Sequence, residues 1–328
     1  MGRGDSRVHM PGKQVRLAEL RRAGIKLGIV LITTPTLMGP EDLAERVERG
    51  EAGWAAVGRS NIGKFAGVPG DDRLIETGAG CGSAGTPGAL QYRDSTTTAV
   101  TFTADAPTQA DETLLLYFTS GTTSKAKLVE HTHTSYPVGH LSTMYWIGLE
   151  PGDVHLNVAS PGWGKHAWSN FFAPWIAEAC VFVYNYERFD ARALMEQMDR
   201  ERVTSFCAPP TVWRMLIQAD LKVLKAPPTK VVSAGEPLNA EVIEQVQRAW
   251  GQTIRDGLGR TETTVQVAHT PSHQVTEGAT GQAVPGTPEA LGHPTPLGAA
   301  GTGATGPQPG PAPGGRDTGP MCPERRTP

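Results

Sequence analysis

Long apolar runs and paired cysteines are both missing from this sequence of 328 residues. No apolar stretch approaches the roughly 20 residues that a membrane-spanning helix requires, and the polar start, Met1–Lys13, lacks the apolar segment of a secretory signal. The four cysteines stand far apart, without a C-x-x-C pair or the spacing of a zinc site. We therefore expect a cytoplasmic chain with reduced thiols and no transmembrane segment.

A strong charge of either sign is missing as well. The sequence has 30 Lys and Arg residues against 33 Asp and Glu residues, a formal net charge of -3. Such a balance produces no field that would draw the chain to nucleic acid or to an anionic membrane surface. We expect no nucleic-acid partner.

Aromatic residues disappear near the end of the chain. Residues 271–328 contain 12 Pro and 12 Gly but no Phe, Trp or Tyr. This composition cannot bury enough apolar surface to offset chain entropy, so it predicts a disordered tail. Because the change at His269–Pro271 is abrupt, we hypothesise that a reading-frame change produced it and that the tail is not the natural continuation. Resequencing the gene tests this, and an undisturbed frame across the junction would exclude it.

The ordered part reads as strands alternating with helices. Residues 25–32 (IKLGIVLI) predict a buried strand, and residues 40–49 (PEDLAERVER) predict a helix with Pro40 in its first turn and Gly50 after its end. Later apolar runs predict strands at 114–118, 181–184, 203–208 and 230–234, with helices at 191–202 and after Asn239. This alternation predicts an α/β fold of layered, mostly parallel sheets flanked by helices. We divide the chain into a flexible start (1–19), one domain (20–270) and the tail (271–328).

The strongest local motif is Tyr117–Lys127 (YFTSGTTSKAK). An apolar strand runs into small hydroxyl residues and a glycine, followed by two lysines. Backbone N–H groups and hydroxyls in such a loop can approach phosphate oxygens, and lysine supplies the compensating charge. An ordinary polar turn with solvated lysines accounts for the composition equally well. The loop is not a Walker A motif, which requires a second glycine before its lysine.

The loop resembles the phosphate-binding signature of the AMP-forming acyl-CoA synthetases, also called the adenylate-forming or AMP-binding family. Residues 233–238 (SAGEPL) resemble the family's adenine loop, and residues 256–263 (DGLGRTET) resemble its Y-G-x-T-E motif. Residues 160–163 and 208–211 also look like family segments. The resemblance covers residues 110–270 well and 20–60 loosely, and it is closest to the short- and medium-chain enzymes.

The resemblance implies the large N-terminal domain of the adenylate-forming fold, here incomplete. It also implies ATP-dependent activation of a carboxylic (fatty) acid to an acyl-adenylate and then to acyl-CoA, with ATP, Mg²⁺ and coenzyme A as cofactor and co-substrates. In the family, a small C-terminal domain carries a lysine that drives adenylate formation. We find no counterpart of that lysine after Pro271, and the chain begins later than the family does.

Residue roles follow from the resemblance position by position. Lys127 and Glu262 would be catalytic, Thr119 and Glu262 would hold Mg²⁺, and Trp163 and His166 would face the acid. Trp168 is a further candidate for the acid side, and a packed aromatic cluster explains it at least as well. The nucleotide-binding residues would be Thr119, Ser120, Gly121, Thr122, Thr123, Ser124, Lys125, Ala126, Lys127, Gly235, Glu236, Pro237, Asp256, Gly257, Leu258, Gly259, Arg260 and Thr261.

Several positions depart from the family pattern. In the phosphate loop, Ser124 replaces the usual glycine, Ala126 the usual proline and Leu128 the second glycine. In the second motif, Leu258 stands where an aromatic residue is usual, and Arg260 stands where many relatives have a neutral residue. We expect weaker nucleotide binding rather than a different reaction. His131 and His133 share a face of an extended segment, which is a weak metal hypothesis because no third ligand is evident.

Three hypotheses stay open at this point. The chain is a working acyl-CoA synthetase, an adenylation domain that loads a carrier protein, or a non-catalytic remnant that at most binds ATP or AMP. Exchange of labelled pyrophosphate into ATP separates the first two from the third.

Overall fold

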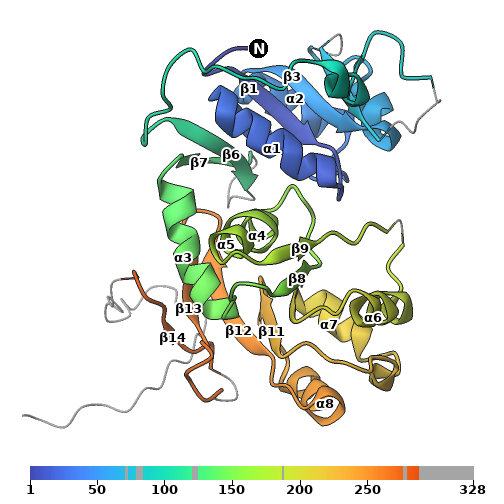
Figure 1. The fold of residues 1–328 in the computed structure, drawn as a ribbon, viewed down its shortest axis with the longest axis vertical. Coiled ribbons are helices and arrows are strands. Elements are labelled where there is room, and N and C mark those ends of the chain that lie inside the picture. Colours follow the sequence, from blue (N-terminus) through green and yellow to red (C-terminus); the bar gives the residue numbers. More distant parts are fainter. Residues whose placement is uncertain (71–72, 79–83, 120–124, 187, 276–278, 288–328) are drawn as a thin grey trace, which may run out of the picture. The chain divides into compact units, whose positions relative to one another are not determined.

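The computed structural model describes residues 1–70, 73–78, 84–119, 125–186, 188–275 and 279–287 (Figure 1). These residues all belong to one contact unit, Met1–Gly292. The central part of the predicted phosphate loop, Ser120, Gly121, Thr122, Thr123 and Ser124, lies outside the described residues, as does the tail from 288 onward.

The first half of the chain forms a seven-stranded sheet, which we call sheet A. Its order is β5-β4-β3-β1-β2-β6-β7. Neighbouring strands run parallel except for the antiparallel pair β6–β7. The strands are β1 (Ser6–Met10), β2 (Val30–Thr33), β3 (Ala52–Gly58), β4 (Leu74–Thr77), β5 (Leu90–Gln91), β6 (Thr113–Thr119) and β7 (Lys127–Thr132).

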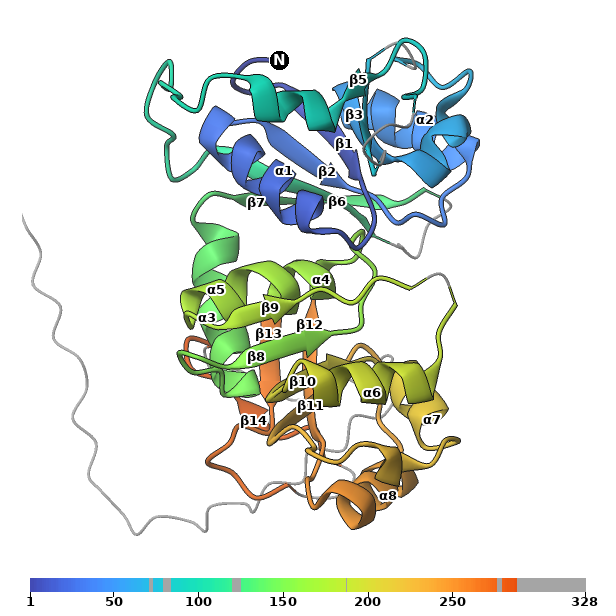
Figure 2. The same ribbon diagram turned by 45° about the vertical axis from the view of Figure 1, so that its right-hand side comes forward.

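The second half forms another seven-stranded sheet, sheet B, in the order β14-β13-β12-β11-β10-β8-β9. The five strands from β9 to β12 are parallel, and β12, β13 and β14 pair antiparallel, as the neighbouring orange strands of Figure 2 show for β12 and β13. The strands are β8 (Val154–Asn157), β9 (Cys180–Phe182), β10 (Ser205–Ala208), β11 (Lys230–Ala234), β12 (Arg255–Arg260), β13 (Thr264–Ala268) and β14 (Gln282–Ala283). The predicted α/β class with mostly parallel sheets is confirmed.

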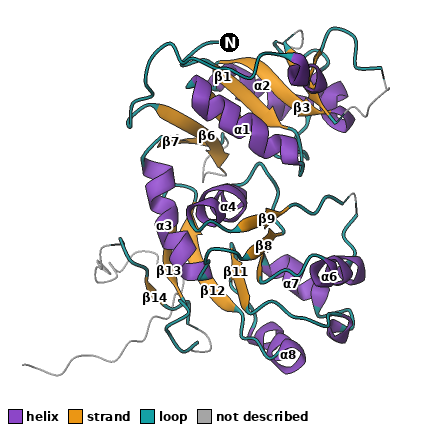
Figure 3. Cartoon of the chain, viewed as in Figure 1, coloured by secondary structure: helices purple, strands orange, loops and turns teal. Residues whose placement is uncertain are grey.

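Helices connect most of the parallel strands (Figure 3). The α-helices are α1 (Val15–Leu27), α2 (Pro40–Arg49), α3 (Ser135–Ile147), α4 (Gly164–Ala167), α5 (Ala173–Ile176), α6 (Ala191–Arg200), α7 (Pro210–Leu216) and α8 (Ala240–Trp250). Shorter turns of 3₁₀ or π geometry are η1 (Arg59–Phe65), η2 (Tyr92–Thr97), η3 (Trp168–Phe172) and η4 (Leu221–Val223). Among the described residues, no helix has the length and apolarity needed to cross a membrane.

Two helices follow their sequence signals closely. Helix α2 spans the predicted residues 40–49, with Pro40 in its first turn and an ion pair between Glu45 and Arg49. Helix α8 begins after Asn239, whose side chain accepts a hydrogen bond from the Glu241 backbone N–H, and ends at Gly251 with φ of 70°. A left-handed residue of this kind is a common helix end.

The predicted flexible start is wrong for residues 6–19. Strand β1 lies between β2 and β3 in sheet A, and its Val8 and Met10 are fully buried. Two polar side chains hide this strand in the sequence. Arg7 donates to the Leu20 carbonyl oxygen at 2.9 Å, and His9 Nε2 lies 3.3 Å from the Leu17 carbonyl oxygen, so both are buried against α1.

The predicted strand at 25–32 is also partly wrong. Helix α1 continues to Leu27 and ends at Gly28 with φ of 73°, and the strand begins only at Val30. An apolar run that contains the last turn of a helix and the first residues of a buried strand has no single period. The close approach of Gly24 to Leu31, where an added Cβ would lie 2.8 Å from Cδ2, packs the two elements together.

The ordered domain extends beyond residue 270. Strand β14 pairs with β13, and Val284 is 1% exposed. The predicted boundary is therefore wrong for residues 279–287, although Gly and Pro dominate the composition of the tail as a whole. The prediction used the composition of residues 271–328 as a whole, which combines β14 with the residues after it.

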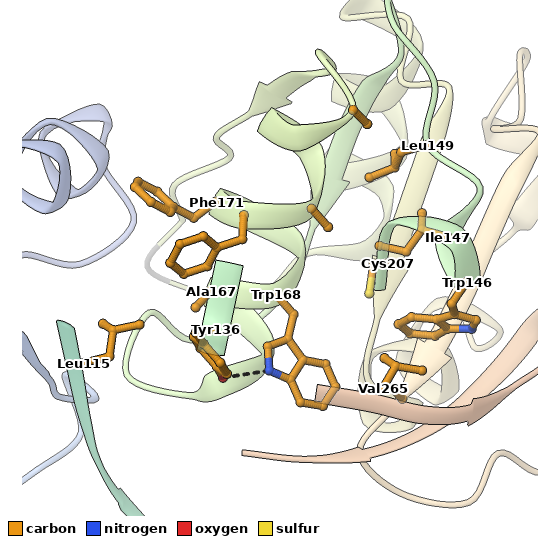
Figure 4. Close-up of a cluster of buried hydrophobic side chains, with 14 of the residues drawn as sticks. Leu115, Tyr136, Trp146, Ile147, Leu149, Ala167, Trp168, Phe171, Cys207 and Val265 are labelled. Carbon is orange, nitrogen blue, oxygen red and sulfur yellow. Dashed lines mark hydrogen bonds between the residues drawn. The ribbon is translucent and has the colours of Figure 1, made fainter. Parts of the chain in front are cut away.

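Aromatic side chains fill the core between α3, η3 and sheet B. Trp146, Trp168 and Tyr136 are buried, and Trp168 Nε1 donates to the Tyr136 hydroxyl at 2.8 Å (Figure 4). Cys207 of β10 is fully buried in the same cluster. The interpretation of Trp168 as a packed aromatic residue is supported, and Cys207 is a core residue. A second apolar cluster lies on the remaining part of sheet B, and a third lies on sheet A.

Candidate functional site

Two predicted nucleotide-binding segments lie side by side at the carboxyl ends of β11 and β12. Ser233 pairs with Asp256 and Ala234 with Gly257 in parallel register. The chain leaves β11 through Gly235, which has φ of 113° and open space around its Cα. Gly235, Glu236 and Pro237 are exposed, so this loop presents its backbone at the edge of sheet B, as a nucleotide loop requires.

The third segment is the hairpin of β6 and β7. Thr119 at the end of β6 pairs with Lys127 at the start of β7, and Lys125 and Lys127 are exposed. The carbonyl oxygen of Ala126 accepts a hydrogen bond of 2.9 Å from Arg49 of α2. The two ends of the predicted phosphate loop are thus fixed to sheet A and to α2.

A histidine joins this hairpin to sheet B. His131 Nε2 of β7 lies 2.7 Å from the carbonyl oxygen of Thr261, in the turn between β12 and β13. The His131 ring stacks on Tyr136 at 3.8 Å between centroids. Burial lowers the pKa of His131, although the nearby Thr261 carbonyl and the Glu262 carboxylate oppose that shift. The contact places Glu262 beside the strand that follows the phosphate loop.

Helix α4 closes in on the same turn. A Cβ added to Gly164 would lie 3.0 Å from the Tyr136 hydroxyl and 3.3 Å from Thr261 Oγ1, so the start of α4 packs directly on Thr261. Trp163, the preceding residue, is 60% exposed. Its side chain is therefore mostly exposed beside the residue that packs on Thr261.

Lys165 lies at the same sheet edge and was not identified from the sequence. Its Nζ donates to the Ala234 carbonyl oxygen at 2.7 Å, at the carboxyl end of β11. Burial lowers its pKa, while Asp256 and Glu236 act to raise it. One signal in the sequence could have identified it: a lysine inside the aromatic segment SPGWGKHAW. Burying a charge there is costly unless the lysine has a polar partner.

Asp256 is one of two carboxylates whose charge acts on Lys165. Burial raises its pKa to about 6, although the backbone N–H groups of Gly257 and Leu238 and the charge of Lys165 oppose that rise. Leu238 directly follows Pro237, so its hydrogen bond brings the Asp256 carboxylate to the end of the predicted adenine loop. Perturbed groups of this kind collect at functional sites.

The remaining residues of the second motif face solvent. Leu258 is 48% exposed, and Arg260 and Glu262 are exposed as well. Glu236 pairs with Arg214 at 3.2 Å on the rim. Leu258 stands where the family motif usually has an aromatic residue, so the exposed apolar side chain at this position is aliphatic.

His166 points to a different place from the motif residues. Its Nδ1 lies 3.3 Å from an Arg21 nitrogen of α1, and its side chain is buried. The structure therefore places Trp163 at the exposed start of α4 and His166 against Arg21 of α1, and the acid-binding roles predicted for both stay predictions.

A divalent cation fits the turn chemically. The Glu262 carboxylate forms no hydrogen bond or ion pair with another described residue, so it is available to a metal. Within the described part of the chain, no three His, Cys, Asp or Glu side chains cluster as metal ligands. Mg²⁺ commonly takes one or two carboxylates and completes its shell with phosphate and water oxygens. His131 is occupied by Thr261, and the hypothesis of a metal at His131 and His133 gains no third ligand.

Comparison with known proteins agrees with these motifs. Residues 15–301 match the family described as AMP-binding enzyme. The 4-hydroxybutyrate–CoA ligase 1 of Metallosphaera sedula is 44% identical over 180 residues, which cover 54% of this chain and 32% of that protein. The uncharacterized acyl–CoA ligase YtcI of Bacillus subtilis is 33% identical over 292 residues, covering 87% of this chain and 53% of YtcI.

The fold agrees too. An acyl-CoA synthetase of Brucella canis superposes with a TM-score of 0.79 at 25% identity, over 87% of this chain and 53% of that one. The chain thus spans between a third and about half of the length of these relatives. Because the family match covers most of the chain and includes the three motif segments at the sheet edges, this chain belongs to the AMP-binding enzyme family.

Proposed function

We propose that this chain binds ATP with Mg²⁺ at the edge formed by the β6–β7 hairpin, the end of β11 and the β12–β13 turn. We further propose that it takes part there in the activation of a carboxylic acid to an acyl-adenylate and then to acyl-CoA. The observation that carries the proposal is the contact of His131 with Thr261, because it joins the phosphate-loop hairpin to the turn that bears Glu262.

The roles of the residues follow from their positions. The exposed Lys125 and Lys127 flank the phosphate loop and supply positive charge, and Thr119 adds a hydroxyl at its start. Gly235, Glu236 and Pro237 would line one side of the adenine, and residues 256–261 the other. Glu262, with Thr119, would hold Mg²⁺, which offsets phosphate charge when it is bound.

The reaction needs no protein nucleophile. A carboxylate oxygen of the acid attacks the α-phosphorus of ATP, and pyrophosphate leaves. The thiol of coenzyme A then attacks the acyl carbon, loses its proton, and AMP leaves. Catalysis of this kind depends on positioning and charge neutralisation. The site accordingly presents lysine, hydroxyl and carboxylate groups.

We propose a small carboxylic acid as the substrate, by likeness to the 4-hydroxybutyrate–CoA ligase. The exposed Trp163 precedes α4, and the half-buried Lys165 of α4 reaches the end of β11. An indole ring and an ammonium group suit an acid that carries both an apolar and a polar part. Four cysteines without pairing motifs support a reducing compartment, and we place the chain in the cytoplasm.

Calorimetry of ATP with Mg²⁺ tests the site first. The unchanged chain should bind, and Glu262→Ala and Lys127→Ala should weaken binding about tenfold or more. Glu244→Ala and Lys222→Ala, on α8 and η4, serve as charge-matched controls away from the site and should bind as the parent does. Absence of binding to the unchanged chain, with its folding verified, would reject the proposal.

Activity is then a separate question. Exchange of labelled pyrophosphate into ATP, measured with a panel of short acids, shows whether the acyl-adenylate forms. Capture of the adenylate by coenzyme A rather than by a carrier protein identifies the acceptor. Nucleotide binding without exchange would support the alternative of a non-catalytic remnant.

A further inference from the structure

A cavity of about 150 Å³ lies beside the start of α1, apart from the nucleotide-binding edge. Residues of α1, η3 and β9 line it, together with Asn157 and His166. Among the described residues that line it, Lys13 and Arg21 are cations and none is acidic. The described part of the wall therefore supplies cations and hydrogen-bond donors without a compensating negative charge.

Arg21 is the buried cation of this cavity. It is 3% exposed, and no Asp or Glu among the described residues forms an ion pair with it. Its guanidinium group donates to the Pro161 carbonyl oxygen at 3.0 Å and contacts His166 Nδ1 at 3.3 Å, and its Nε has no partner. A buried guanidinium without a carboxylate is costly, which favours a bound anion.

Lys13 supplies a second cation at the cavity. Its Nζ donates to the Tyr186 hydroxyl at 3.1 Å and lies 4.3 Å from the centre of the Tyr186 ring. None of the ion pairs formed among the described residues includes it. Burial lowers the pKa of Lys13 to about 8, which is the behaviour of an ammonium group without a counter-charge.

The first turn of α1 adds a third source of positive potential. This helix has 13 residues, its N-cap residue Gln14 makes no side-chain cap, and no acidic residue lies in its first turn. Gln14, Val15 and Leu17 line the cavity. The free N–H groups and the dipole of a helix start favour an anion.

The wall also has a large apolar part. Phe171, Trp175, Val181 and Phe182 line the cavity. A cavity of roughly this volume in another protein holds a benzene molecule. An inorganic anion would leave these side chains without contacts, whereas a ring or a short branched chain would cover them.

We propose that this cavity is a binding site for a small monocarboxylate with an apolar body about the size of benzoate, with its carboxylate between Arg21 and Lys13. The site is separate from the nucleotide-binding edge. Consecutive residues of α4 divide the two, since Lys165 reaches the end of β11 while His166 contacts Arg21. Binding here does not depend on the proposed activity.

Benzoate is the probe, and benzyl alcohol is its neutral counterpart of similar shape. Calorimetry on the full chain without ATP should detect benzoate and not benzyl alcohol. Quenching of tryptophan emission by benzoate should disappear in Trp175→Phe, because Trp175 lines the cavity. Arg21→Met and Lys13→Met should each weaken benzoate binding about tenfold or more. Lys26→Met, at the other end of α1, should leave it unchanged.

Three outcomes would overturn the proposal. Equal binding of benzyl alcohol would show an apolar cavity without an anion site. Loss of benzoate binding in Lys165→Met but not in Lys13→Met would place benzoate in the acid subsite of the nucleotide edge. Full competition by inorganic phosphate, with the same response to the variants, would assign the cavity to a simple anion. Because Arg21→Met changes a buried residue, the folding of this variant is checked by comparing its circular dichroism with that of the parent. If Arg21→Met does not fold, the benzoate affinity of Lys13→Met, which changes a half-exposed residue, tests the proposal.

Discussion

His131 of β7 donates its Nε2 proton to the carbonyl oxygen of Thr261, 2.7 Å away in the β12–β13 turn. The Nδ1 atom lies 3.3 Å from the Ser135 hydroxyl. Burial lowers the pKa of the imidazole, and both ring nitrogens have a polar partner. One side chain thereby connects the two sheets at the point where the motif segments converge.

Replacing His131 with Phe should keep an aromatic ring against Tyr136 and remove both ring-nitrogen contacts, those with Thr261 and with Ser135. The Thr261 carbonyl would lose its partner, so we expect unfolding to require about 1–2 kcal/mol less. ATP affinity should fall several-fold because the Glu262 turn is no longer held against β7. Urea unfolding and calorimetry measure the two effects. Tyr145→Phe, on the exposed side of α3, is the control. An unchanged affinity in a variant of reduced stability would show that the contact is only structural.

Asp256 should make the folding stability depend on pH. Its pKa is about 6 in the folded chain against an ordinary value of 3.8, so the folded state binds more protons than the unfolded state between these values. Stability should therefore fall as the pH rises from about 4 to about 6, by at most about 3 kcal/mol, and stay level above. Asp256→Asn should abolish this slope and be more stable than the parent at pH 7. Denaturant unfolding across this pH range measures both, and an equal slope in the variant would contradict the assignment.

Lys165 should help to limit the rise of the Asp256 pKa, after the backbone N–H groups of Gly257 and Leu238. Its charge lowers that pKa, so Lys165→Met should move it further above about 6. Carbon-13 NMR titration of the Asp256 carboxyl detects the change directly. Lys222→Met, on η4, is the matched control. A pKa that stays in place would mean that the lysine charge is screened from Asp256.

Gly259 should tolerate no side chain. A Cβ there would lie 2.1 Å from the carbonyl oxygen of Thr264 and 2.8 Å from Trp168 Cη2. Because the first of these atoms belongs to the paired backbone of β13, Gly259→Ala should cost about 3 kcal/mol of stability. Gly53→Ala, in β3, meets no atom within 4 Å and should be neutral or slightly stabilising. Thermal unfolding separates the two, and similar melting temperatures would show that β12 can shift.

Benzoate binding at the α1 cavity should weaken as the pH rises through about 8. Lys13 loses its proton there, and an anion binds the protonated form. The titratable groups beside Lys13 are Tyr186 and His166, and the Arg21 guanidinium lines the same cavity. Burial lowers the pKa of His166 and raises that of Tyr186, so both titrations move away from the range around pH 8. Calorimetry between pH 6.5 and 9.5, roughly the range around the lysine pKa, should show the decline in the parent and not in Lys13→Met.

The sequence predicted elements where one signal dominated. Helix α2 and helix α8 had caps, stops and an apolar stripe that agreed with one another, and β11 was an isolated apolar run. Strand β1 was missed because Arg7 and His9 are buried by hydrogen bonds to carbonyl oxygens of α1, which only the tertiary structure supplies. Lys165 was missed for the same reason, since its partner Ala234 is 69 residues away. The motif segments, by contrast, are contiguous, so their resemblance was readable without any tertiary contact.

The strands of the two sheets do not interleave along the chain. All seven strands of sheet A end by Thr132, and all seven of sheet B begin after it, at Val154. During synthesis, sheet A therefore has every one of its partners before the first strand of sheet B has left the ribosome. Such an order keeps loop closures short within each half and lets the amino-terminal half fold first. The aromatic helix α3, which lies between the halves in sequence, would then offer a preformed apolar surface on which the later strands assemble.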